Sequence, residues 1–282
     1  MPRHAPLSWN PDFASRSVLF APLLPVAEAL RWLNHWPDLA TLDALFKSSA
    51  RPIVTGSALP VHLVASASRV DTGYEAGVFL SGALQTREAS WHDLLNVLVW
   101  LTFPRAKAAL NARHFATPPG SVATTKNRTS TSDALTLFDE SGIIVASSDP
   151  ELLHLLRAFA WKDLFWNKRE EVSACMRFVI FGHGLYEQSL QPFIGLTGKA
   201  LLVKVEETFF ATSLAGQLRH LDERAAAALS DTERFLGTRE LAPLPILGIP
   251  GWWDANNVAT FYDDGNYFRS RRRDRVPGSP AA

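Results

Sequence analysis

REASWHDLLNVLVWLTFPRAKAALNARHF, residues 87–115, is the stretch that decides how this chain folds. Apolar residues recur at helical spacing on both sides of Pro104, which predicts two consecutive helices. Ser90 has the side chain of an N-cap for a helix that begins at Trp91. Phe103 is biased away from helical backbone because a proline follows it, and Pro104 suits the first turn of the second helix. We therefore expect a kink or a tight junction at this proline.

Each predicted helix carries a polar stripe among apolar residues. At about 100° per residue, the members lie within about 100° of arc on the first helix and within about 60° on the second. The stripes consist of His92, Asp93 and Asn96, and of Lys107, Asn111 and His114. Such groups are costly to bury without partners, so either a buried network or a substrate must satisfy them. The second stripe would suit an anionic or carbonyl-bearing ligand, and equally a solvated helix face.

The composition narrows the class of protein. The chain has 282 residues, of which 47% are apolar, enough for a sizeable core. Lys plus Arg and Asp plus Glu number 28 each, so the zero net charge argues against a general polyanion-binding surface. A single cysteine, Cys175, excludes an intrachain disulfide framework and a zinc site of clustered cysteines.

Two further features bear on location. The first residues lack the basic-then-apolar pattern of a signal peptide, and the longest apolar stretch, residues 94–103, is far shorter than the ~20 residues that span a bilayer. We therefore expect a cytoplasmic protein without a transmembrane segment.

The rest of the chain predicts a helix-rich α+β fold with a mixed or antiparallel sheet. Residues 1–268 are expected to form a single globular domain, and residues 269–282 a disordered basic tail. Residues 134–138 and 143–146 predict a β-hairpin whose turn contains Asp139 and Glu140. Residues 117–132 predict a long loop, and the proline-rich segment after Glu240 is expected to wrap the surface.

The segment FGHGLYEQ, residues 181–188, is a second element that could carry chemistry. His183 and Glu187 are four residues apart on a short helix that directly follows a predicted strand, so both lie on one helical face. A neutral imidazole and a carboxylate so placed could share a proton or bind one metal ion. They could equally be a capping or helix-surface pair.

The chain also resembles a known family over several long strings. These are WHDLLNVLVWLTFPRAKAALNARH, DALTLFDESGIIVAS, FGHGLYEQSLQPFIGLTGKALL and PLPILGIPGWW. They are similar to a bacterial family of proteins catalogued as domain of unknown function 3025. The resemblance implies a bacterial source and one family-length domain, and it assigns no catalytic residue.

The leading functional prediction is a cytoplasmic enzyme of the hydrolase or transferase type that acts on a polar or anionic substrate. His183 or His92 would be the general base, and Glu187 its partner or a metal ligand. The residues expected to bind substrate are Lys107, Asn111, His114 and Asn96. The cofactor stays open, with a divalent metal ion as one alternative. Convergence of His92, His114, His183 and Glu187 on one pocket is the observation that tests this prediction.

The alternative is a non-enzymatic binding or scaffold protein. Tryptophan-rich surfaces and the arginines of residues 271–275 would then meet a partner, a membrane or nucleic acid, although so few charges would add only modest, salt-sensitive affinity. The oligomeric state is not determined by any of these patterns.

Overall fold

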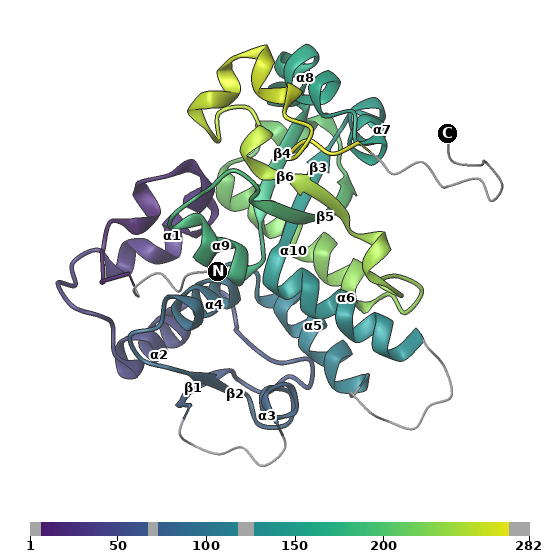
Figure 1. Ribbon diagram of the computed structural model, residues 1–282. Coiled ribbons are helices and arrows are strands. Elements are labelled where there is room, and N and C mark those ends of the chain that lie inside the picture. The colour runs from purple at the N-terminus through teal and green to yellow at the C-terminus, as the bar shows by residue number, and fades with distance from the viewer. Residues whose placement is uncertain (1–6, 67–72, 118–126, 271–282) are drawn as a thin grey trace.

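The computed structural model describes residues 7–66, 73–117 and 127–270, and its centre is a four-stranded mixed sheet (Figure 1). The strand order is β4-β3-β5-β6, with β3 antiparallel to β4 and parallel to β5, and with β6 antiparallel to β5. The strands are β3 (Gly142–Ser147), β4 (Met176–Ile180), β5 (Thr197–Lys204) and β6 (Ala242–Pro245). The prediction of a helix-rich α+β fold with a mixed sheet is confirmed.

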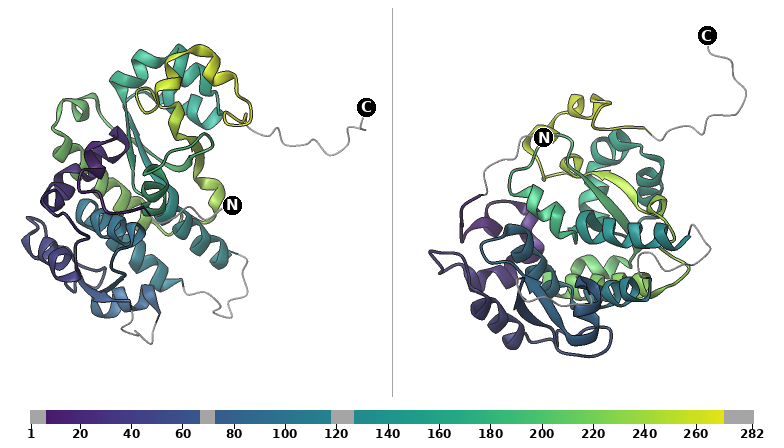
Figure 2. Two further views of the ribbon diagram at one scale, coloured as in Figure 1. Left: turned by 60° about the vertical axis from the view of Figure 1, so that its left-hand side comes forward. Right: turned by 60° about the horizontal axis from the view of Figure 1, so that its bottom comes forward.

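A second, smaller sheet consists of two parallel strands, β1 (His62–Ala65) and β2 (Ala83–Thr86). Helix α3 (Tyr74–Ser81) lies between them in the chain and forms part of their crossover connection. In Figure 1 and Figure 2 this small sheet and the large sheet lie on opposite sides of α4 (Trp91–Thr102) and α5 (Pro104–Ala116). Residues 87–115, which contain α4 and α5, therefore lie in the middle of the molecule.

The other helices cover the two sheets. They are α1 (Leu24–Ala27), α2 (Leu39–Ser48), α6 (Asn127–Ser141), α7 (Pro150–Ala158), α8 (Arg169–Cys175), α9 (His183–Ser189) and α10 (Leu214–Ser230). Short 3₁₀ segments are η1 (Phe13–Ser15), η2 (Val18–Leu23), η3 (Glu28–Leu30), η5 (Glu207–Ala211), η6 (Thr238–Glu240), η7 (Ile246–Gly248), η8 (Asp254–Asn257) and η9 (Ala259–Asp263), and η4 (Asp163–Asn167) is a π turn.

The predicted junction between the two central helices is confirmed. The Ser90 side chain accepts a hydrogen bond from the backbone N–H of Asp93 and caps α4, while Phe103 leaves the helical region and Pro104 opens α5. The start of α5 is held by α10, because the buried carboxylate of Asp222 accepts a hydrogen bond of 2.8 Å from the backbone N–H of Ala106. The local sequence thus fixes where these helices begin.

The predicted β-hairpin is wrong. Helix α6 continues to Ser141 and leads directly into β3, which pairs with β4 and β5. Ala134, Leu135 and Phe138 are fully buried at helical spacing, so the apolar period of this segment is that of a helix. Asp139 and Glu140 therefore lie in the last turn of a helix and not in a hairpin turn.

Two other expectations change. The predicted loop 117–132 is helical from residue 127 onward, and residues 118–126 lie outside the described part of the chain. The proline-rich segment does not wrap the surface, because Leu244 and Ile246 are fully buried and residues 242–245 form an edge strand, where missing proline N–H groups are tolerated. Of the predicted basic tail, residues 271–282 are likewise outside the described residues.

The large sheet, α4 and α10 contribute to one continuous hydrophobic core. Nearly every residue of α4 after its first turn is buried, so the polar groups at its N-terminal end mark the edge of that core. Among the described residues, no helix combines the length and the apolar character needed to cross a bilayer.

Candidate functional site

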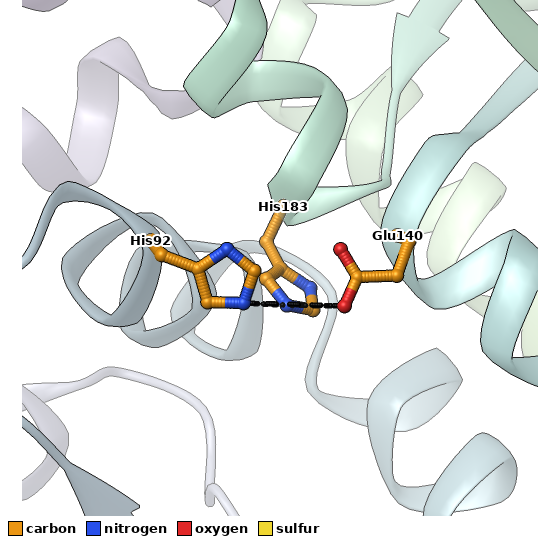
Figure 3. A group of neighbouring side chains, drawn as sticks. All are labelled: His92, Glu140 and His183. Carbon is orange, nitrogen blue, oxygen red and sulfur yellow. Dashed lines mark hydrogen bonds and ion pairs between the residues drawn. The ribbon is translucent and has the colours of Figure 1, made fainter. Parts of the chain in front are cut away.

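Three side chains from three different helices meet at one point (Figure 3). They are His92 in the first turn of α4, Glu140 in the last turn of α6 and His183 at the start of α9. The two Nε2 atoms of the imidazoles are 3.0 Å apart. Glu140 Oε1 lies 3.5 Å from His183 Nε2 and 3.9 Å from His92 Nε2. Within the described part of the chain, this is the one group of three His, Cys, Asp or Glu residues that could hold a metal ion.

The large sheet brings Glu140 and His183 together. Strands β3 and β4 are antiparallel with Ile143 opposite Ile180, so the residues just before β3 lie beside those just after β4. The Gly142 carbonyl accepts hydrogen bonds from the backbone N–H groups of residues 181 and 182 and fastens this corner. The last turn of α6 and the first turn of α9 consequently lie side by side at the same end of strands β3 and β4.

Glycine on each side of His183 permits this close approach. A Cβ atom on Gly182 would lie 2.5 Å from the Glu140 carbonyl oxygen, and a Cβ on Gly184 would overlap the Glu140 carboxylate. Neither position accepts a side chain without displacing Glu140. Glycine at positions 182 and 184 therefore allows the start of α9 to pack closely against the end of α6.

Each imidazole has a carboxylate behind its other nitrogen. Glu187 Oε2 lies 2.9 Å from His92 Nδ1, and Asp139 Oδ2 lies 3.8 Å from His183 Nδ1. The Glu187 carboxylate accepts a hydrogen bond and so favours the His92 tautomer with the proton on Nδ1, whereas Asp139 is too far from His183 Nδ1 for a hydrogen bond and acts on that ring through its charge. With the proton on Nδ1 of both neutral rings, each Nε2 would be an acceptor that faces the common point.

Asp139 is in turn held by a buried lysine. Lys107 Nζ is 2.5 Å from Asp139 Oδ1, and the lysine is only 3% exposed. Burial alone would raise the pKa of Asp139, but the charge of Lys107 is the largest of the influences that outweigh it and lower that pKa. Asp139 is therefore a buried carboxylate that stays ionised beside His183.

The two imidazoles differ in their surroundings. Burial lowers the pKa of His183 to about 4, so its ring is neutral at neutral pH. The hydrogen bond to Glu187 raises the pKa of His92 above its usual value. Two imidazole nitrogens and one carboxylate oxygen converge. Because unprotonated acceptor atoms repel one another, such an arrangement is favourable only when a proton or a cation lies between them.

The spacing fits a metal ion. A point equidistant from three atoms so separated lies about 2.0 Å from each, the distance at which zinc binds nitrogen and oxygen ligands. Around such an ion, adjacent tetrahedral ligands lie about 3.4 Å apart and adjacent octahedral ligands about 2.9 Å apart. The observed separations of 3.0, 3.5 and 3.9 Å span both values, and the point about 2.0 Å from all three atoms lies in their plane, so the spacing fits a divalent ion without selecting its geometry.

The three side chains open into a polar pocket of about 310 Å³ between the small sheet and helices α4, α5, α6 and α9. Of the residues predicted from the sequence to be catalytic or substrate-binding, four line this pocket: His92, Asn96, His114 and His183. Its other walls are Ser66, Tyr74, Glu75, Gln85, Arg87, Asp93, Thr136, Asp139 and Glu140.

The remaining sequence candidates lie outside the pocket lining. Glu187 contacts the pocket only through His92. Lys107 is bonded to Asp139, and Asn111 donates a hydrogen bond of 2.6 Å to the Glu75 carboxylate. Lys107 and Asn111 therefore bind side chains that line the pocket and hold them in place.

Asp139 and Glu140 are the site residues that sequence reasoning missed. The hairpin predicted for this segment places both in a turn. The helical spacing of Ala134, Leu135 and Phe138 was the signal that could have placed them on a helix end next to a strand.

A larger pocket of about 810 Å³ lies elsewhere and is lined by aromatic residues that include Trp91, Trp252 and Trp253. Arg16 and Asp254 are the charged residues in its lining. Because catalysis of polar reactions needs convergent titratable groups, the smaller pocket is the better candidate for a chemical site.

Comparisons with known proteins place the chain in a family. No curated protein and no solved structure matched it. The family described as "Protein of unknown function (DUF3025)" matches residues 61–272, a range that includes every residue of the site. The chain therefore belongs to the DUF3025 family of proteins of unknown function.

Proposed function

We propose that this protein is a metal-dependent hydrolase in which His92, Glu140 and His183 bind one divalent ion, with Zn²⁺ as the best fit. The observation that carries the proposal is the convergence of two imidazole nitrogens and one carboxylate oxygen, within 3.9 Å of one another, in a polar pocket. Two imidazoles and one carboxylate are a donor set of catalytic zinc sites, which keep a fourth position for water. Imidazole nitrogens favour zinc over magnesium and calcium, which prefer oxygen ligands.

The carboxylates behind the imidazoles support the same proposal. Metal-binding histidines usually donate their second ring N–H to a carboxylate or a carbonyl, which fixes the tautomer and raises ligand basicity. Glu187 supplies this contact for His92 at 2.9 Å, and Asp139 lies behind His183. Lys107 then keeps Asp139 ionised and in place.

The chemistry would follow from the open position. When bound, such an ion would supply a polarising charge and a water of lowered pKa. His114 lines the same pocket, and burial lowers its pKa, so it would supply a neutral imidazole as a proton acceptor there. Tyr74 and Asn96, joined by a hydrogen bond of 2.9 Å, shape the wall against which the substrate would lie.

Metal binding is the decisive test. Protein freed of metal by a chelator and of any affinity tag would be titrated with Zn²⁺ by calorimetry, with the folded state checked by circular dichroism. We expect one ion per chain, and a loss of affinity of more than about 100-fold in His92→Ala and His183→Ala. His154→Ala, which removes an exposed histidine from α7, should bind as the wild type does.

A metal-free alternative rests on the same hydrogen bond. His92, oriented by Glu187, could act alone as a general base through Nε2. Hydrolysis of p-nitrophenyl acetate that is lost with chelator and restored by Zn²⁺ supports the metal enzyme. Activity that persists in chelator but disappears in His92→Ala supports the metal-free base and counts against the proposal.

A further inference from the structure

The wall of the small pocket carries an excess of negative charge. Four carboxylates line it, and Arg87 is the one lysine or arginine among its lining residues. The carboxylates belong to Glu75, Asp93, Asp139 and Glu140. Glu187 adds a fifth, which reaches the site through its hydrogen bond to His92.

The cations near the pocket are already engaged. Arg87 binds Asp93 through two side-chain contacts, of 2.8 Å from Nη2 and 3.0 Å from Nε. Lys107 lies behind the wall and is bonded to Asp139. An anionic substrate group would therefore meet no uncommitted lysine or arginine among the residues that line the pocket.

Glu75 is the carboxylate that remains without a cation. Its Oε2 atom accepts a hydrogen bond of 2.6 Å from the amide of Asn111, a neutral partner. Burial, and after it the charge of Asp139, raises the pKa of Glu75 to about 7. A positive group in the pocket would stabilise the charged form of Glu75.

A second observation is independent of these charges. The side chain of Asn96 is buried, with 7% exposure, and lines the pocket. Its amide nitrogen donates to the Tyr74 hydroxyl, while its Oδ1 atom has no hydrogen-bond partner among the described residues. An unpaired buried acceptor is unfavourable, and a ligand that donates a hydrogen bond here would satisfy it.

We infer that the substrate carries an ammonium or similar cationic nitrogen, which donates to Asn96 and pairs with Glu75, next to the bond that is hydrolysed. This inference rests on the proposed metal site and specifies its substrate class. It replaces the anionic group expected from Lys107 in the sequence, because that lysine is committed to Asp139.

Three hydroxamates with the same two-methylene spacer test the inference on zinc-loaded protein at pH 8. Each chelates zinc through the same group, and they differ only at the far end: 3-aminopropanohydroxamate has an ammonium, butyrohydroxamate a methyl and succinate monohydroxamate a carboxylate. We expect the ammonium compound to bind at least about tenfold more tightly than the carboxylate compound, with the methyl compound between them.

Glu75→Gln keeps the acceptor for Asn111 but removes the charge, and it should abolish most of the preference for the ammonium compound. Glu151→Gln, which neutralises an exposed carboxylate on α7, should leave the preference unchanged. Equal affinities, tighter binding of the carboxylate compound, no measurable binding of the ammonium compound, or a preference that survives Glu75→Gln would each overturn the inference. These results would leave the metal site standing, whereas failure of Zn²⁺ itself to bind overturns both proposals.

Discussion

The ion pair between Lys107 and Asp139 shows at the residue scale how a buried charge is kept in a helix-rich core. Its two side chains are 4% and 13% exposed, so both have lost most of their hydration. Such a pair is sustained by mutual attraction and by further contacts, here the imidazole of His183 at 3.8 Å from Asp139. Removal of one partner leaves the other charge buried without compensation.

We predict that Lys107→Met lowers the free energy of unfolding by about 3–5 kcal/mol, because Asp139 is then an unpaired buried carboxylate. Urea unfolding in chelator measures this cost without a contribution from bound metal. The matched control is Lys162→Met, which breaks an exposed pair with Asp263 and should cost less than about 1 kcal/mol. Similar losses in the two variants would show that the buried pair has no special role.

At the scale of elements, the site depends on the corner where α6 enters β3 and β4 leads into α9. The backbone of Gly182 faces the carbonyl of Glu140, whereas Gly184 faces mainly the carboxylate of Glu140. A methyl group at Gly184 would therefore displace a flexible side chain more than it would displace backbone. A substitution at Gly184 can thus move the Glu140 carboxylate, the proposed ligand, while the fold is kept.

We predict that Gly184→Ala weakens Zn²⁺ binding by about 10–100-fold, because the added Cβ pushes the Glu140 carboxylate out of its position. Stability in chelator should fall by no more than about 1–3 kcal/mol. Gly265→Ala is the control, since a Cβ there meets nothing within 4 Å. Unchanged zinc affinity in Gly184→Ala, measured by calorimetry, would argue against Glu140 as a ligand.

For the whole molecule, the three proposed ligands connect parts of the chain that are far apart in sequence. His92 comes from the buried central helix, Glu140 from the helix that precedes the middle of the large sheet, and His183 from the helix that follows its edge strand β4. One ion would cross-link all three elements. Binding that requires the folded arrangement stabilises the folded state as a whole.

We predict that Zn²⁺ at about 100 times its dissociation constant raises the free energy of unfolding by about 2.7 kcal/mol, and that chelator removes this increment. The measurement is unfolding by denaturant with and without Zn²⁺. His183→Ala should lose the increment, while His154→Ala should keep it. An increment of the same size in His183→Ala would place the stabilising ion elsewhere.

Features that depend on neighbouring residues could be predicted from the sequence. Ser90 and Pro104 set the limits of the central helices, and the four-residue spacing of His183 and Glu187 placed them on one helix after a strand. Caps, proline geometry and apolar period act within a few residues, so they can be recognised without a partner segment. The segment 134–146 was misread because a short apolar run before a glycine suits a strand as well as a helix end.

Which polar groups meet depends on how distant segments of the chain pack together. The hydrogen bond between His92 and Glu187 joins residues 95 positions apart, and it depends on how α4 packs against α9. Glu140 reaches the site because β3 and β4 pair in one register, with glycine at the corner. Lys107, prominent in the sequence as a free cation, is instead the partner of Asp139. These contacts follow from long-range packing and strand register, and no local pattern encodes either of them.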